Sequence, residues 1–283
     1  MSLLVLATGP LSLIEDAGRC GYAHLGVSMS GAADRGSAQQ ANLAVGNPAD
    51  AAVIETLAGG LQLRAKSPSL VAIGGAPTVA EVAGQAVPRL RPFPLKAGQE
   101  LRLGTSASGL RCYVAVAGGI AVSPVLGSRS YDTMSRLGPP PLQPGQVLPV
   151  GPDYGTPQQV TDAWPAAAPE TLELVMWPGP RRDWIAADIT KLAWRVSAAA
   201  SRIGTRLDGP SLAWAASHLG RELASEPTRR GAIQVPPSGQ PIIFGPDHPA
   251  TGGYPVVGIL SESASDALAQ ALPGQAIRLR PLS

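Results

Sequence analysis

The chain has 283 residues but only two cysteines, Cys20 and Cys112, which lie far apart in the sequence. A single disulfide between them stays open, but two isolated thiols in a reducing compartment fit this spacing better. Only three histidines are present, so we expect no histidine-rich metal site and no metal cluster. Charged residues make up 15% of the chain and the net charge is +2, which predicts binding to neither nucleic acid nor membrane surfaces.

Long apolar runs are also missing. No stretch approaches the roughly 18 residues that a membrane-spanning helix needs. The apolar start, Met1–Pro10, lacks the cationic leader and cleavage-like end of a signal peptide. We therefore expect a cytoplasmic protein.

Several common catalytic motifs are absent as well. The phosphate-binding pattern G-x-x-x-x-G-K-[ST] does not occur, and neither does G-x-G-x-x-G after a strand, H-E-x-x-H or C-x-x-C. None of the lysines has the setting of a biotin carrier.

What the sequence does have is glycine and proline, 33 and 29 residues, spaced between short runs rich in Val, Ile and Leu. Such punctuation is typical of many short strands joined by turns and predicts an all-β fold, mainly β with a few short helices. The Pro- and Gly-rich stretch Gly138–Ala168 is the best boundary, and it divides the chain into domains at 1–150 and 151–283. The predicted strands include Leu3–Ala7, Val53–Leu57, Leu61–Arg64, Leu70–Ile73, Glu100–Leu103, Leu110–Ala117, Leu172–Met176, Ile242–Phe244, Val256–Leu260 and Ala276–Leu279.

Three short helices are predicted. Ser30 is the expected N-cap of a helix over Ala32–Val45, which ends at Gly46-Asn47-Pro48. Asp183–Leu192 and Ser263–Leu272 are the other candidates.

The segment Gly231–Pro255 is the strongest functional candidate. It reads as a strand, a tight turn at Pro236–Gly239, a second strand, and then a polar loop. That loop contains Asp247, His248, Thr251, Gly252, Gly253 and Tyr254. Loops on a rigid β-scaffold commonly hold functional residues, and glycines permit positive φ and close backbone approach to a ligand. The alternative is an acid and an imidazole that only make structural hydrogen bonds.

Three further segments leave alternatives open. Asp16 and Arg19 could position a carbonyl or carboxylate group, or could staple a turn through an ion pair. The segment Gly26–Arg35 could hold an anion at a helix start, or provide ordinary capping. Arg202 and Arg206 surround a glycine and could bind an anion, or could lie in a solvated basic turn.

Taken in order, these segments resemble the signatures of one family across nearly the whole chain. The matching motifs are Gly9-Pro10, Asp16-x-Gly18-Arg19-x-Gly21-Tyr22, Gly26-Val27-x-x-Ser30-Gly31-Ala32-x-Asp34, Val114–Ile120, Val125–Ser130, Arg202-x-Gly204-x-Arg206-Leu207-x-Gly209, Gly231–Pro236 and Thr251–Pro255. They resemble the biotin-dependent carboxyltransferase family, whose members are also called allophanate hydrolase subunit 2 or the C subunit of 5-oxoprolinase.

The resemblance implies two cyclophilin-like β-barrel domains and a place in an enzyme complex. Members pair with a B-like subunit, and in the 5-oxoprolinase system also with an A-like subunit, to open 5-oxoproline to glutamate with ATP. Two alternatives stay open: a carboxyltransferase that moves a carboxyl group from carboxybiotin to urea or a similar amide, and a non-catalytic protein that antagonises a kinase inhibitor.

For the first reading, the candidate residues fall into two groups. Those expected to act on a small-molecule substrate as catalytic residues are Asp16, Asp247, His248 and Tyr254. Those expected to bind it are Arg19, Tyr22, Ser30, Asp34, Arg202, Arg206, Gln234, Thr251, Gly252 and Gly253.

Overall fold

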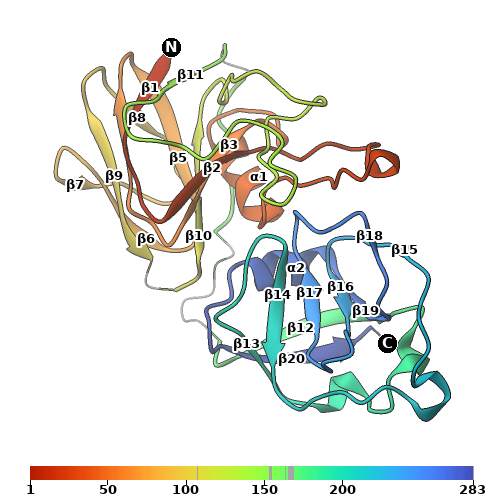
Figure 1. The fold of residues 1–283 in the computed structure, drawn as a ribbon. Helices are drawn as coiled ribbons and strands as arrows, with labels where there is room; N and C mark the ends of the chain where they lie inside the picture. The colour runs from red at the N-terminus through yellow and green to blue at the C-terminus, as the bar shows by residue number, and fades with distance from the viewer. Residues whose placement is uncertain (107, 153–154, 163, 165–168, 283) are drawn as a thin grey trace. The chain divides into compact units, whose positions relative to one another are not determined.

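The computed structural model describes residues 1–106, 108–152, 155–162, 164 and 169–282. Within them, short strands alternate with turns, and the predicted all-β fold with barrel architecture is confirmed (Figure 1). The chain divides into two compact units. The first comprises Met1–Arg19, Ser30–Asp132 and Arg136–Ala168, and the second comprises Cys20–Met29, Thr133–Ser135 and Pro169–Ser283. Residues 153–154, 163 and 165–168 of the predicted boundary region lie outside the described residues.

The first unit contains two antiparallel sheets. One has the order β11-β1-β4-β9-β6-β7 and the other β2-β3-β10-β5-β8. Their strands are β1 (Ser2–Thr8), β2 (Leu11–Glu15), β3 (Val53–Leu57), β4 (Leu61–Ala65), β5 (Ser69–Gly75), β6 (Thr78–Val82), β7 (Gln85–Ala86), β8 (Phe93–Leu95), β9 (Glu100–Ser106), β10 (Arg111–Val116) and β11 (Val147–Pro149).

The main core of this unit consists of side chains from both sheets, among them Val5, Leu63 and Leu101 from the first and Ile54 and Val114 from the second. In the first sheet, alternation of apolar and polar residues buries one face of a strand. Strand β4, for example, has the sequence Leu-Gln-Leu-Arg-Ala, and its three apolar residues are buried. Strand β10 is buried along its whole length because its other face packs against helix α1 (Arg35–Ala44). The helix contributes small side chains such as Ala38 and Ala41 to that contact.

The second unit is a closed seven-stranded barrel with the order β12-β19-β16-β17-β14-β13-β20. It closes through the parallel pair of β12 and β20, in which Leu172 lies opposite Ile277. Its strands are β12 (Thr171–Pro178), β13 (Trp194–Val196), β14 (Gly204–Asp208), β16 (Ala232–Gln234), β17 (Ile242–Phe244), β19 (Val256–Leu260) and β20 (Ala276–Pro281); β15 (Glu226–Pro227) and β18 (Thr251–Gly252) form a separate two-stranded ribbon. The barrel core includes Leu174, Trp194, Ile233 and Leu279.

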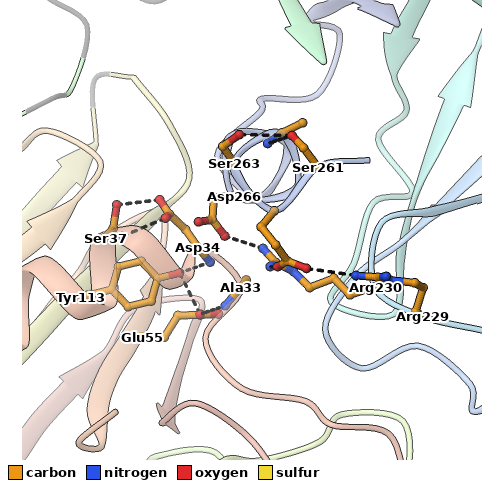
Figure 2. Close-up of polar contacts among 12 residues, drawn as sticks. Ala33, Asp34, Ser37, Glu55, Tyr113, Arg229, Arg230, Ser261, Ser263 and Asp266 are labelled. Carbon is orange, nitrogen blue, oxygen red and sulfur yellow. Dashed lines mark hydrogen bonds and ion pairs between the residues drawn. The ribbon is translucent and has the colours of Figure 1, made fainter. Parts of the chain in front are cut away.

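Helix α2 (Glu262–Ala269) packs against β12 and buries Ala264 and Leu268. Ser261 caps it by accepting a hydrogen bond from the Ala264 amide at 3.1 Å. The buried Arg230 binds Glu262 at 2.8 Å. It also binds Asp266 at 2.5 Å (Figure 2), and the two contacts tie the chain just before β16 to this helix. The predicted helix at Ser263–Leu272 is thus present, shifted toward the N-terminus.

The other two helix predictions need correction. Helix α1 starts at Arg35, and its N-cap is Asp34 and not Ser30, because the Asp34 carboxylate accepts the Ser37 amide at 3.0 Å. The segment Asp183–Leu192 forms no α-helix but two single 3₁₀ turns, η2 (Arg182–Trp184) and η3 (Ile189–Lys191). Two further 3₁₀ turns, η1 (Ala23–Leu25) and η4 (Ala216–His218), were not predicted. In the described part of the chain no helix is long and apolar enough to cross a membrane.

Candidate functional site

The loop after β17 is anchored by Asp247, whose side chain is fully buried. Its Oδ2 lies 2.8 Å from Arg202 Nε and its Oδ1 lies 3.0 Å from Arg202 Nη2, a two-pronged ion pair. The Thr133 amide and hydroxyl also donate to Oδ2, at 3.0 and 2.7 Å. Because both oxygens accept hydrogen bonds from these groups, Asp247 and Arg202 hold the loop in place. For Asp247 this is the structural alternative that the sequence left open.

The next residue, His248, is 8% exposed and stacks on Phe244, with ring centroids 6.1 Å apart. Its Nδ1 lies 2.7 Å from the carbonyl oxygen of Pro249. A carbonyl oxygen can only accept, so Nδ1 carries a proton and donates it to Pro249. In the neutral ring the lone pair is then on Nε2, which is the atom suited to accept a proton from a reacting group.

Gln234 supports the other end of the loop. A bulge between β16 and β19 places Gln234 opposite Val256, and its buried side chain donates from Nε2 to the Tyr254 carbonyl at 3.1 Å. A Cβ added at Gly252 would lie 2.6 Å from that Nε2, so a larger residue there would force the Gln234 side chain to shift. The sequence also suggested that these glycines allow a positive φ angle, but neither Gly252 nor Gly253 has one.

The ribbon of β15 and β18 joins this loop to a second segment. Glu226 lies opposite Gly252 and Pro227 lies opposite Thr251, which is exposed. Arg181 binds the Glu226 carboxylate through Nε, at 3.0 and 3.2 Å from its two oxygens. The hydrogen bond from Arg181 lowers the pKa of Glu226. The ribbon is therefore fixed to the chain that follows β12.

A cavity of about 700 Å³ lies at the C-terminal end of the loop. Of the predicted site residues, only Gly253 and Tyr254 line it. Its other walls include Leu212, Trp214 and Leu223. Trp214 is held by Trp184, which it meets edge to face with centroids 5.5 Å apart. The volume lies within the range of small-molecule sites.

Two other predicted residues of the second unit lie outside these contacts. Arg206 is exposed on β14, so of the two arginines around Gly204 only Arg202 is buried against the loop. Tyr22 precedes η1, where its carbonyl accepts the Leu25 amide at 2.9 Å. A second cavity, of about 630 Å³ and lined by residues such as Lys191, Arg195 and Arg278, contains no predicted site residue.

In the first unit, Asp16 and Arg19 meet the same segment, Ser128–Ser130. The Asp16 carboxylate accepts from the hydroxyls of Ser128 and Ser130, both at 2.6 Å, and from the Arg129 amide at 2.6 Å. Arg19 is 2% exposed and donates from Nη2 to the Ser130 carbonyl. Among the described residues no ion pair joins Asp16 to Arg19, and Nε and Nη1 of Arg19 have no hydrogen-bond partner. Of the two alternatives for this segment, the turn closed by an Asp16–Arg19 ion pair is therefore not found among the residues described, and Arg19 keeps donors that suit a carboxylate.

Ser30 and Asp34 make hydrogen bonds that hold neighbouring segments of the first unit together. Ser30 is buried with φ at 55° and donates to the Tyr131 carbonyl at 3.4 Å. The Asp34 amide donates to the phenol of Tyr113 at 2.8 Å, and that phenol donates to Glu55 at 2.9 Å (Figure 2). Burial and the nearby Glu55 charge raise the pKa of Tyr113 well above its usual value. The phenol therefore stays protonated and continues to donate.

Replacing Tyr113 with phenylalanine tests this buried network. The Asp34 amide loses its acceptor and Glu55 loses a donor, so we expect the free energy of unfolding to fall by about 1–3 kcal/mol. Urea unfolding of the variant beside the partly exposed control Tyr131→Phe measures it. A fall no larger than that of the control would mean that the phenol contributes nothing to holding the helix start.

The contacts that sequence reasoning missed come from residues distant along the chain. Thr133 and Arg202 hold Asp247, Ser128 and Ser130 hold Asp16, and Thr228 contacts His248 at 3.2 Å.

Both cysteines are free, as expected. Cys20 is exposed, whereas Cys112 is buried, and burial raises the pKa of the Cys112 thiol to about 12. The described residues include no group of three His, Cys, Asp or Glu that could hold a metal ion.

Known proteins resemble this chain in sequence and fold. Residues 25–281 match the family described as "Carboxyltransferase domain, subdomain A and B". The C subunit of 5-oxoprolinase from Escherichia coli (strain K12) is 34% identical over 289 residues, covering 97% of this chain and 89% of that protein.

Solved structures agree. The crystal structure of TTHA0988 is 36% identical, with a TM-score of 0.86, and the match covers 99% of this chain and 55% of that one. Urea amidolyase of K. lactis is 27% identical with a TM-score of 0.93, over 100% of this chain and 19% of that one. The chain thus spans about half of the first solved relative and a fifth of the second. The chain therefore belongs to the carboxyltransferase-domain family, subdomain A and B.

Proposed function

We propose that this chain is the C-like subunit of a prokaryotic ATP-dependent 5-oxoprolinase, a hydrolase that opens 5-oxoproline to glutamate in a complex. The partners are the B-like and A-like subunits of that complex. The likeness to the C subunit of E. coli 5-oxoprolinase, which extends over nearly all of both chains, supports this choice. ATP belongs to the complex, because this sequence lacks a phosphate-binding loop motif.

The main structural support for the proposal is the hydrogen bond of His248, which fixes the position of its ring proton. Its Nδ1 proton is donated to Pro249, so Nε2 can take a proton from water as that water attacks the activated lactam carbonyl. The C–N bond then breaks, the ring nitrogen takes the proton that His248 removed from water, and the phosphate that ATP supplied to activate the carbonyl leaves as inorganic phosphate, which gives glutamate. The Gly252 and Gly253 amides are the proposed donors to the developing oxyanion, and Tyr254 orients the substrate from the adjoining cavity.

Asp16 and Asp247 are expected from the sequence to be catalytic, but their contacts fit a catalytic role less well. Each carboxylate already accepts several hydrogen bonds that hold backbone segments together. We propose that both are positioning residues. Separately, within the first unit, we propose that Arg19 binds an anionic group, since its Nε and Nη1 have no hydrogen-bond partner among the residues that the structure describes.

The likeness to K. lactis urea amidolyase favours a second candidate function, carboxyl transfer to urea or a similar amide. In this case carboxybiotin is a co-substrate that supplies the carboxyl group. The cavity beside Tyr254 has apolar walls such as Leu212 and Trp214, and its volume of about 700 Å³ is large enough for a biotin ring. The chain would bind and orient that ring, while His248 would take the proton from the attacking amide.

Reconstitution with the chains encoded beside it distinguishes these functions. We expect ATP hydrolysis by the complex to depend on 5-oxoproline. We also expect one glutamate to form for each ATP that is hydrolysed. Carboxylation of urea with a biotinylated carrier, and no 5-oxoproline turnover, would overturn the first proposal in favour of the second. A stable complex without either activity would favour the regulatory reading.

A further inference from the structure

Thr228, just after β15, contacts the loop at the point where His248 is held. Its hydroxyl Oγ1 donates to the carbonyl oxygen of Pro249 and lies 3.2 Å from His248 Nδ1. Its amide donates to the Ala250 carbonyl at 3.0 Å. Thr228 lies 20 positions before His248 in the sequence, so no short motif contains both residues.

The chemistry of these atoms fixes the direction of each hydrogen bond. The Pro249 oxygen accepts from both the Thr228 hydroxyl and His248 Nδ1. Since the hydroxyl proton points to Pro249, Oγ1 turns a lone pair toward Nδ1. The imidazole therefore has two acceptors at Nδ1, and both favour the tautomer with its proton on that nitrogen.

The position of Thr228 does not depend on its own hydroxyl. Strand β15 is paired with β18, and Arg181 holds the neighbouring Glu226 through two oxygens. The Arg181 amide in turn donates to the Val256 carbonyl at 3.0 Å. The ribbon thus presents the hydroxyl to the ring from a backbone that has its own anchors.

We propose that Thr228 is a positioning residue that locks His248 in the Nδ1-protonated tautomer and aims Nε2 at the reacting group. This rests on the proposed function only in so far as His248 reacts; the tautomer itself can be observed without turnover. Thr228 contacts neither substrate nor reacting atoms in this role and acts only through the histidine.

Replacing Thr228 with valine removes the hydroxyl and keeps the side-chain shape, while Thr228→Ser restores the hydroxyl. Thr171→Val, at an exposed position of β12 far along the chain, is the matched control. The ¹⁵N shifts of the histidine ring report the tautomer in the full-length chain at a pH where the ring is neutral. The chain has three histidines, so loss of one signal in His248→Gln assigns the spectrum.

In the unaltered chain we expect Nδ1 of His248 to be protonated and Nε2 to carry the lone pair. In Thr228→Val the two shifts should move toward each other as the second tautomer becomes populated, whereas serine and the Thr171 control keep the original shifts. In the complex, kcat should fall about tenfold, the loss expected for one ordinary hydrogen bond, with KM within about twofold and with recovery in Thr228→Ser.

An Nε2-protonated ring in the unaltered chain, or identical shifts in Thr228→Val, would overturn the proposal. A complex without 5-oxoproline turnover, but with the expected change of tautomer, would instead refute the proposed function and leave the positioning role standing. The spectrum and the assay therefore separate the two failures.

Discussion

A complex that contains His248→Gln is expected to lose 5-oxoproline-dependent ATP hydrolysis by about 100-fold or more in kcat/KM, the range of a lost general base. Glutamine keeps a polar side chain of similar reach, but its amide nitrogen cannot accept a proton as Nε2 does. The loss should lie in kcat, because the proposed role is proton transfer and not substrate binding.

His24→Gln is the matched control for this substitution. That ring also has Nδ1 within hydrogen-bond distance of a backbone carbonyl, Gly21 at 3.0 Å, but it is exposed and outside the loop. We expect its complex to turn over at the normal rate. Full activity in His248→Gln, with normal assembly, would remove His248 from the mechanism.

Asp247→Ala is expected to lower the free energy of unfolding by about 3–5 kcal/mol, because it removes the bidentate partner of a buried guanidinium. Arg202 is 4% exposed and cannot replace that partner with bulk water. The Thr133 amide and hydroxyl lose their acceptor as well. Urea unfolding of the full chain, followed by signals from the second unit, measures the effect.

A double variant shows whether the cost comes from the buried Arg202 charge that has lost its Asp247 partner. Arg202→Met with Asp247→Leu removes both charges and keeps apolar volume, so it should unfold at a higher urea concentration than Asp247→Ala alone. A single-variant loss below about 1 kcal/mol would show that the ion pair does not hold the loop.

The strands could be predicted from the sequence, because glycine and proline mark their ends and the runs between them are apolar. Ile242–Phe244 and Val256–Leu260 lie where they were expected. The start of α1 could not be placed in the same way. Ser30 and Asp34 are both capping residues, and the choice between them depends on contacts that hold Ala33 and Asp34 outside the helix, from Glu55 at 2.8 Å and Tyr113 at 2.8 Å.

The candidate loop was also found from sequence, through its density of acid, imidazole, hydroxyl and glycine. Its supports were not. Arg202 lies 45 positions from Asp247, and Thr133 lies 114 positions away. Those pairings follow from how the second unit folds, so no local pattern reveals them, and an aspartate that anchors a loop looks the same in sequence as one that transfers protons.

The most direct test of the proposed 5-oxoprolinase function is ATP hydrolysis by the partner chains with and without this protein. We predict hydrolysis that depends on 5-oxoproline and forms glutamate only when this chain is present. Equal turnover by the partner chains alone would contradict the claim that this chain is a working part of a 5-oxoprolinase.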